Sequence, residues 1–396
     1  MHTASRRLHD QRHYGLDWLR AGAFILLIFY HVGMAFVPWD WHVKADHIVS
    51  WAVWPMRAVN PWRLLLLFVV SGFATAHLLD KRGAAGRMMR ERLTFLGLPL
   101  LFGMLVVVPP QSWAEVREKG LFSGDFLSFY LDHYLAFDWR FGIILPTWNH
   151  LWYLAYLLAY IAVAAALVGG LPQARRSAWC RRWAGLLGGW RLPATAFGAL
   201  LTARLLLGPL FPVTHALVDD WYAHAQFAGA FTLGWLIARE RRLLEDAARI
   251  AGLLLLLGIA AFAMRPLVEG LAGGLPPLLR AGLDAPFFCA QQAAIPIALI
   301  GFAHRYWNRD NGLRRYLTAA VFCWYVLHQT IIVLTVHALK GTGLPALQEF
   351  ILVTAATVAG CLAGYELLRR VPGLRVLVGI RPPDGREQAL RRQGAG

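Results

Sequence analysis

Three ionisable residues interrupt the apolar run LDWLRAGAFILLIFYH, which covers residues 16–31. Arg20 and His31 are eleven residues apart. In a helix this spacing is close to three full turns, so both side chains lie on one face, about 16 Å apart along the axis. Asp17 precedes Arg20 by three residues and joins the same face. Lipid does not tolerate such a polar face, so we expect it to point into the protein or a cavity.

The residue types on this polar face suit proton transfer and charge stabilisation. Histidine titrates near neutrality, so His31 is a candidate general base. Arg20 is a candidate for stabilising negative charge, and Asp17 for holding Arg20 in place. Two simpler interpretations stay open: Asp17 and Arg20 form an interface pair with Arg20 reaching toward the headgroups, and His31 is a neutral histidine bonded to a neighbouring helix. Asp17 lies about 21 Å from His31 along the helix, so the ring partner of His31 is unassigned.

The composition indicates that these residues belong to a polytopic membrane protein. Of the 396 residues, 58% are hydrophobic and only 16% are charged, and long apolar runs recur along the chain. Soluble domains carry roughly 25% charged residues, so we expect an all-α bundle of transmembrane helices. The net charge of +16 does not indicate nucleic-acid binding, because the arginines form short clusters between apolar runs. The four cysteines are isolated, which indicates neither a zinc site nor a disulfide framework.

About ten spans, each near the ~20 residues that a bilayer needs, are expected from the apolar runs. They lie at 16–38, 61–79, 93–112, 148–169, 192–211, 222–239, 250–265, 284–304, 316–338 and 346–368. The seventh is the weakest, because Arg265 and Pro266 cut it short. We expect the first to be a retained span rather than a signal peptide.

Basic residues concentrate in alternate loops, which predicts that both termini are cytoplasmic. We expect residues 1–370 to form one membrane domain. Residues 371–396, rich in arginine and proline, are expected to be a cytoplasmic basic tail with little structure. In the longest outer loop, residues 121–137 have the pattern of an amphipathic helix at the membrane surface.

The spacing of Arg20 and His31 resembles the R-x10-H signature of the acyltransferase-3 family of integral membrane acyltransferases. The run 16–44 is similar to the branch of that family that contains the periplasmic glucan succinyltransferases. Further elements resemble the family pattern: FVVSGF at 68–73, RMMR at 87–90, HLWYL at 150–154 and YVLHQ at 325–329. The resemblance extends from residue 14 to about residue 340, and residues 1–370 would then be the acyltransferase domain.

The resemblance implies an O-acyltransferase of the bacterial inner membrane. Its donor would be a cytoplasmic acyl-CoA, and its acceptor a hydroxyl of an extracytoplasmic glycan, with succinyl and acetyl as the acyl groups to consider. Acyl-CoA would be a cosubstrate, with no bound cofactor and no metal. The expected partners are therefore the lipid bilayer, the donor and a carbohydrate, without nucleic acid. His31 would act either as general base or as a transient acyl carrier, and the sequence does not separate the two. Arg20 would either stabilise developing negative charge or hold the head of the donor.

The RMMR element places two guanidinium groups where the donor phosphates would be. Arg87 and Arg90 are three residues apart, so on a helix they point the same way. A guanidinium offers a planar fork of donors that suits a phosphate. The alternative is ordinary anchoring by a basic cytoplasmic loop.

Five further residues are candidates for a cavity or an acceptor site: His150, Trp152, Tyr325, His328 and Ser71. His150 either binds the acceptor or assists proton transfer, or it is an interfacial residue beside Trp152. Tyr325 and His328 share a helical face, where His328 either lines the cavity or makes an interhelical hydrogen bond. Ser71 is better explained as a small residue that permits close helix contact than as a nucleophile.

A transporter or flippase without chemistry is the rival class, because a polar face in a membrane helix also lines substrate paths. Transporters commonly contain inverted repeats with paired broken spans, and no convincing pair is visible. A sensor or scaffold is disfavoured, because buried charge is costly to keep without a function.

Overall fold

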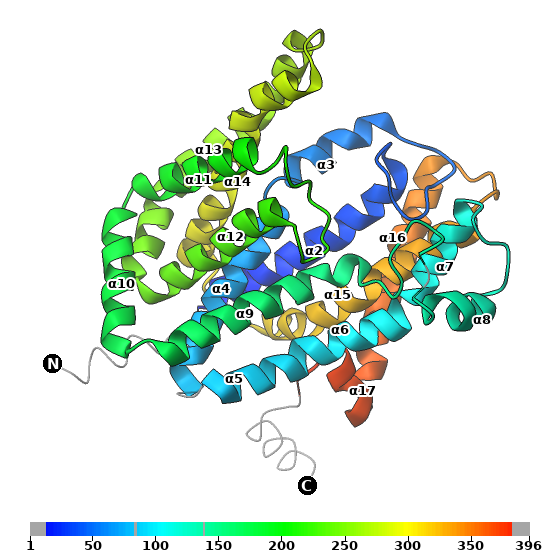
Figure 1. Cartoon of the computed structure of the whole chain (residues 1–396), viewed down its shortest axis with the longest axis horizontal. Helices are drawn as coiled ribbons and strands as arrows, with labels where there is room; N and C mark the ends of the chain where they lie inside the picture. The colour runs from blue at the N-terminus through cyan, green and yellow to red at the C-terminus, as the bar shows by residue number, and fades with distance from the viewer. Residues whose placement is uncertain (1–12, 83–84, 138, 382–396) are drawn as a thin grey trace. The chain divides into compact units, whose positions relative to one another are not determined.

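The computed structural model describes residues 13–82, 85–137 and 139–381, and these are helices and loops without a β-strand (Figure 1). The longer helices are α2 (Tyr14–Phe36), α4 (Arg63–Arg82), α9 (Trp152–Gly170), α10 (Gln173–Leu186), α11 (Arg191–Leu206), α12 (Trp221–Arg239), α13 (Arg241–Leu271), α14 (Pro277–Tyr306), α15 (Gly312–Leu339) and α16 (Ala346–Leu368). The expected all-α class is confirmed.

Shorter helical segments connect or extend these helices. They are η1 (Ser50–Ala52), α3 (Val53–Val59), α5 (Ala85–Arg92), α6 (Leu98–Phe102), α7 (Pro109–Glu118), α8 (Phe126–Phe129), η5 (Asn149–Leu151) and α17 (Pro372–Leu377), with π-helical turns η2 (Leu93–Gly97), η3 (Gly103–Val107) and η4 (Tyr130–Tyr134). The amphipathic segment expected at 121–137 is helical over α8 and η4. Helix α17 occupies the start of the expected tail, and residues 382–396 lie outside the described part.

Seven helical segments within the described residues are long and apolar enough to cross a membrane. They correspond to α2, α3–α4, α9, α13, α14, α15 and α16. An eighth candidate is the pair 86–107 and 109–118, which is bent by 41°. Helix α11 has only 16 residues, and His224 and Gln226 lower the hydropathy of α12. The chain is therefore a multi-pass membrane protein. That α11 and α12 also cross the membrane, as the expected ten spans require, remains a prediction.

Helix α13 corrects the expectation that the seventh span is the weakest. It continues through Pro266 to Leu271 and is one of the seven candidates. The Arg265 Nε donates a hydrogen bond of 2.6 Å to Oδ1 of Asp284 on α14. The Arg265 guanidinium also lies 5.2 Å from the centroid of the Phe288 ring. Pairing on the neighbouring helix makes the arginine tolerable within an apolar span.

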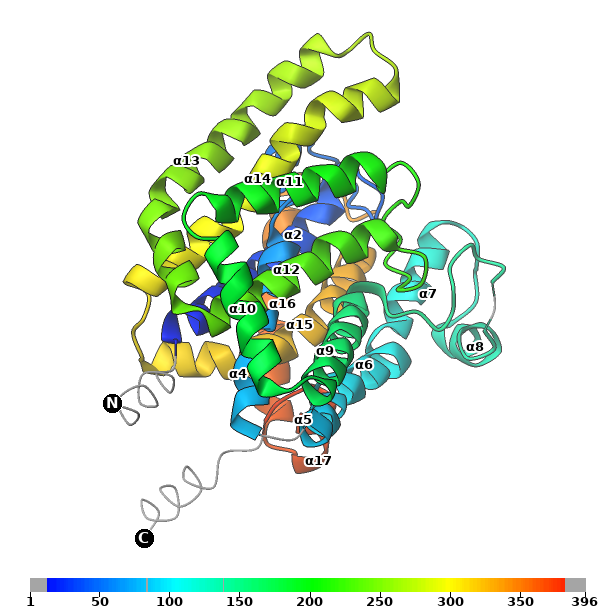
Figure 2. The same ribbon diagram turned by 60° about the vertical axis from the view of Figure 1, so that its left-hand side comes forward.

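The chain divides into two compact units, and the boundaries between them fall within helices. The first unit comprises the described residues of 1–23, 57–88 and 160–318, and the second those of 24–56, 89–159 and 319–396. In the first unit, α13 and α14 form a long antiparallel pair (Figure 2).

Helices α4 and α12 of the first unit approach very closely through two glycines. A Cβ added to Gly72 would be 1.9 Å from the carbonyl oxygen of Phe231, and one added to Gly234 would be 1.8 Å from that of Val69. Gly72 belongs to the SGF element, so this element packs helix against helix, as small residues do in membranes. Ser71, beside it, is partly buried, and its carbonyl accepts a hydrogen bond from Thr75 Oγ1.

The second unit has a core of small and β-branched residues at one end of its helices. Its buried members are Val32, Ala35, Phe36, Val43, Ala45, Ala114, Ile332, Val333, Val336 and Val353. This cluster joins α2, α7, α15 and α16 to the loop after α2. It therefore fixes the end of α2 that carries His31 relative to the part of α15 that carries His328.

Candidate active site

A pair of histidines forms the centre of the site in the second unit. His31 Nδ1 on α2 lies 2.7 Å from His328 Nε2 on α15. The ring centroids are 5.0 Å apart and the rings are nearly parallel, with an interplanar angle of 7°. His328 is fully buried, whereas His31 is half-buried. The structure thus brings together two residues that the sequence placed in separate spans.

The backbone of α15 determines which nitrogen of each ring carries the proton. His328 Nδ1 lies 2.7 Å from the carbonyl oxygen of Tyr325, which only accepts hydrogen bonds. A neutral His328 therefore carries its proton on Nδ1 and presents a lone pair at Nε2. His31 then donates from Nδ1 to that lone pair, which places its own basic lone pair on Nε2.

His150 lies against the same pair from η5. Its ring centroid is 5.0 Å from that of His328 at an interplanar angle of 85°, and its Nε2 donates a 3.1 Å hydrogen bond to the carbonyl of Val326. Its Nδ1 is buried without a hydrogen-bond partner. The Tyr325 hydroxyl donates a 2.6 Å hydrogen bond to the His150 carbonyl, which fixes η5 to α15.

Aromatic rings surround the buried side of this cluster. Tyr325 contacts Phe24 and Tyr153, with ring centroids 5.1 Å and 6.0 Å away. Trp152 is also buried, and its ring packs edge-on against Tyr156 with a centroid distance of 5.2 Å. Tyr325 therefore positions His150 through its hydroxyl and His328 through its carbonyl.

A second polar cluster adjoins the histidine pair along α15, at Gln329. Both carboxylate oxygens of Glu115 on α7 accept hydrogen bonds. Oε2 accepts a short one from His42 Nδ1, and Oε1 accepts one of 2.6 Å from Lys119 Nζ. Since a carboxylate accepts, His42 carries its proton on Nδ1 and accepts at Nε2 from Gln329 Nε2, at 2.9 Å.

Gln111 connects this second cluster to the rest of the unit. Its Oε1 accepts hydrogen bonds from Gln329 Nε2 and Asn149 Nδ2, both at 3.1 Å. Its Nε2 donates at 2.6 Å to Thr330 Oγ1, which donates to the Val107 carbonyl. Gln111 and Gln329 are buried. A buried network whose polar groups all have hydrogen-bond partners holds its members in one arrangement. It therefore fixes the residues that flank His150 and His328.

At the start of α2, in the first unit, Asp17 is bound by an arginine of α15. Arg314 Nη1 donates a 2.6 Å hydrogen bond to Asp17 Oδ2, and its other nitrogens bind Asp310 Oδ1 at 2.7 Å and 2.9 Å. Hydrogen bonds from Arg315 and then Arg314 lower the pKa of Asp310 to about 2. Arg20 is half-buried and has no ion-pair partner among the described side chains. Asp17 therefore ties α2 to α15.

Arg87 and Arg90 are both exposed on α5. Met88 between them is buried, so the helix presents the two guanidinium groups to the surroundings while anchoring itself through the methionine. The i, i+3 relationship expected from the sequence is present in the helix.

Several residues of the site were not found by sequence reasoning. Glu115, Gln111 and Asn149 were not singled out, and Arg314 was counted only as a basic residue of a loop. Gln111 and Glu115 are four residues apart after two prolines, a weak sign of a polar helical face. Within the described residues, no group of three or more His, Cys, Asp or Glu side chains is arranged to hold a metal ion.

Comparisons with known proteins agree with the motifs. The family described as "Acyltransferase domain" matches residues 13–366. Proteins named "Glucans biosynthesis protein C" from Shigella boydii serotype 4 (strain Sb227), Escherichia coli (strain K12) and Shigella dysenteriae serotype 1 (strain Sd197) are each 28% identical to this chain over 149 residues. That segment is 37% of this chain and 37% of each relative, so the match spans just over a third of the length of these relatives.

No solved structure matches the chain. The family match covers most of the chain, including both residues of the R-x10-H spacing and both histidines of the pair. The chain therefore belongs to the acyltransferase-3 family of membrane acyltransferases.

Proposed function

We propose that this chain is an O-acyltransferase of the bacterial inner membrane that transfers a short acyl group, succinyl or acetyl, from acyl-CoA to a hydroxyl of an extracytoplasmic glycan. The observation that carries the proposal is the hydrogen bond between His31 and His328, because it leaves a basic lone pair on Nε2 of the half-buried ring. The glucan-related names of the relatives support a carbohydrate acceptor.

In the general-base route, His31 Nε2 removes the proton of the acceptor hydroxyl while the alkoxide oxygen attacks the thioester carbonyl. The C–S bond then breaks, and the CoA thiolate takes up the proton held by His31, so no other reactant is needed. The imidazolium that forms between these steps keeps its Nδ1–H bond to His328.

In the acyl-carrier route, His31 Nε2 itself attacks the thioester carbonyl, and the C–S bond breaks to release the CoA thiolate. The acceptor hydroxyl then attacks the acyl-imidazole, the bond between Nε2 and the acyl carbon breaks, and the hydroxyl proton passes to the thiolate. Both routes need the same tautomer of His31. When the acceptor is omitted, only the acyl-carrier route leaves a labelled acyl group on the protein. Mass spectrometry of the intact chain detects that group.

We assign Arg20, Arg87 and Arg90 to the donor. Arg20 lies about 16 Å from His31 along α2, too far to touch a carbonyl reacting at that ring, so we assign it to a distal, charged part of acyl-CoA. Arg87 and Arg90 would bind the phosphates through their exposed guanidinium groups. Asp17 contributes by holding α2 against α15 through Arg314.

The test is loss of the acyl-CoA thioester by the full chain in nanodiscs, with a soluble glucan present. Wild type should consume succinyl-CoA or acetyl-CoA, and the double variant Arg87→Gln/Arg90→Gln should raise KM for the donor by about tenfold with little change in kcat. Arg181→Gln/Arg182→Gln, two exposed arginines of α10, is the matched control. If the control raised KM equally, both pairs of arginines would act only by general electrostatic attraction of the anionic donor.

A further inference from the structure

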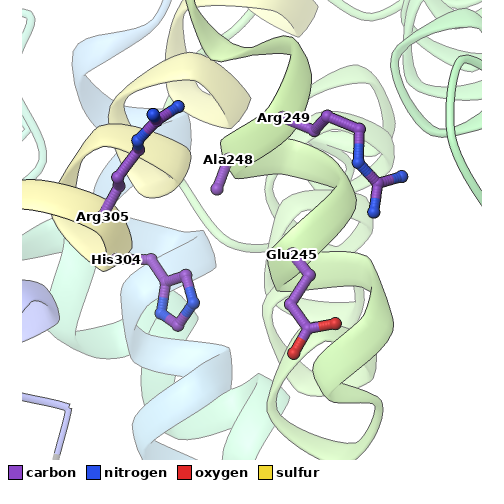
Figure 3. A pocket seen from close by; sticks show the side chains of 5 residues that line it. All are labelled: Glu245, Ala248, Arg249, His304 and Arg305. Carbon is purple, nitrogen blue, oxygen red and sulfur yellow. The ribbon is translucent and has the colours of Figure 1, made fainter.

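A basic pocket lies in the first unit, between the start of α13 and the end of α14. It has a volume of about 470 Å³ and is lined by Glu245, Ala248, Arg249, His304 and Arg305. Figure 3 shows the first three residues on one helix and the last two on the other. None of these residues has a role in the proposed acyl transfer.

The acidic groups around the pocket already have basic partners. Glu245 Oε1 accepts from Arg241 Nε at 2.9 Å, and Asp246 Oδ1 accepts from Arg249 Nη1 at 2.8 Å, with Arg242 Nε at 3.9 Å from Asp246 Oδ2. Arg305 has no carboxylate partner among the described side chains, and its guanidinium lies 5.3 Å from the Tyr306 ring centroid. The surroundings therefore carry excess positive charge.

His304 lines the pocket beside Arg305, and its Nδ1 is buried inside the protein. An anionic headgroup that carries hydroxyl groups offers acceptors for the arginines and donors for the Glu245 carboxylate.

An apolar surface continues from the pocket along α13. Gly252 is one turn beyond Ala248 and Arg249, and a Cβ built there meets nothing within 4 Å. Leu253 and Leu256 follow on the same side and are 51% and 64% exposed. Helix α13 is the second most exposed of the seven candidate spans, with 28% of its apolar window buried. A polar pocket directly followed by a lipid-facing apolar surface matches a phospholipid better than a soluble anion.

The geometry points to a binding site for an anionic phospholipid, with its headgroup at the pocket that Arg249 and Arg305 line and its acyl chains along Gly252, Leu253 and Leu256. The site lies where the span Arg241–Leu271 begins and the span Pro277–Tyr306 ends, which is the level of the headgroups. The positive-inside rule places this arginine-rich end in the cytoplasm, where anionic lipids gather.

The proposal is tested by lipid binding to the purified full chain in detergent, measured by native mass spectrometry with short-chain phosphatidylglycerol, short-chain phosphatidylcholine and inorganic phosphate as separate probes. We expect phosphatidylglycerol to bind and millimolar phosphate not to displace it. Arg249→Gln/Arg305→Gln should weaken binding about tenfold, a factor that corresponds to 1.4 kcal/mol. Ala248→Phe, which fills the pocket without changing charge, should weaken binding by a similar factor.

Arg242→Gln/Arg309→Gln is the matched control, because both arginines are exposed at the same end of the unit and neither lines the pocket. It should change binding less than twofold. Equal losses in the two double variants would contradict a specific site and leave only general attraction of basic residues to anionic lipid. Equal binding of phosphatidylcholine, or displacement by phosphate, would also overturn the proposal, the latter in favour of a soluble anion. Unchanged size-exclusion profiles exclude misfolding, and none of these outcomes depends on acyltransferase activity.

Discussion

His31 on α2 and His328 on α15 share a 2.7 Å contact between ring nitrogens, although 297 residues separate them in the chain. His328 is held in turn by the Tyr325 carbonyl one turn earlier on α15. A backbone group, rather than a carboxylate, thus sets the tautomer of both rings.

Replacing His328 should reduce the chemical step more than donor binding. His328→Phe removes the acceptor for His31 Nδ1–H, so the wrong tautomer becomes accessible, and we expect kcat to fall about 10²–10³-fold with KM for acyl-CoA nearly unchanged. His328→Gln, whose side-chain oxygen accepts a hydrogen bond, should recover part of the rate. Steady-state kinetics in nanodiscs measures both. Equal losses of kcat in the two variants, with normal melting curves, would contradict the claim that His328 sets the tautomer of His31.

The glycines between α4 and α12 should be needed for folding of the first unit. Gly234→Ala places a methyl group where the Val69 carbonyl lies, so the helices must separate, and we expect a loss of about 2 kcal/mol or more in the free energy of unfolding. Gly229→Ala on the same helix is the matched control, because a Cβ there meets nothing within 4 Å. The control should be neutral or slightly stabilising. Similar melting temperatures for both variants would show that the close contact is absent.

His215, in the loop between α11 and α12, should make stability fall in mild acid. Burial, followed by the opposing effect of Asp220 and the reinforcing effect of Arg63, lowers the pKa of His215 to about 4 from its usual 6.5. In the unfolded chain His215 therefore binds a proton below pH 6.5, whereas in the folded chain it binds one only below about pH 4. Stability contributed by this group is full above pH 6.5, falls by up to about 3 kcal/mol as the pH drops to 4, and then levels off.

The measurement is denaturant unfolding of the detergent-solubilised chain at pH 7 and pH 5. His215→Asn is the test variant, because asparagine tolerates the positive φ of 58° at this position. It should flatten the dependence between these two pH values. A wild-type curve that is already flat there, or a slope that His215→Asn leaves unchanged, would exclude His215 as its source.

The sequence predicted local features of the site well. The polar face of α2 follows from helical periodicity alone, and the all-α class follows from long apolar runs. The i, i+3 pairs Arg87–Arg90 and Tyr325–His328 are present because helix geometry fixes them.

Contacts between distant segments were not predictable, because nothing in periodicity encodes which helices meet. Asp17 was expected to hold Arg20, one turn away, and the structure places Arg314, 297 residues away, on its carboxylate. The partner of His31 was left open for the same reason. Glu115 was expected in an outer loop beyond the span 93–112, whereas in the structure α7 begins at Pro109 and carries Glu115.

The most direct measurement is the rate of thioester loss from acyl-CoA by the full chain in nanodiscs. It compares wild type with His31→Gln and, as a control, with His47→Gln, an exposed histidine of the loop after α2. We expect His31→Gln to lose at least about 10²-fold in kcat while keeping its melting temperature and its affinity for the donor, and His47→Gln to match wild type. A folded His31→Gln that turns over donor at the wild-type rate would contradict the assignment of His31 to the chemistry.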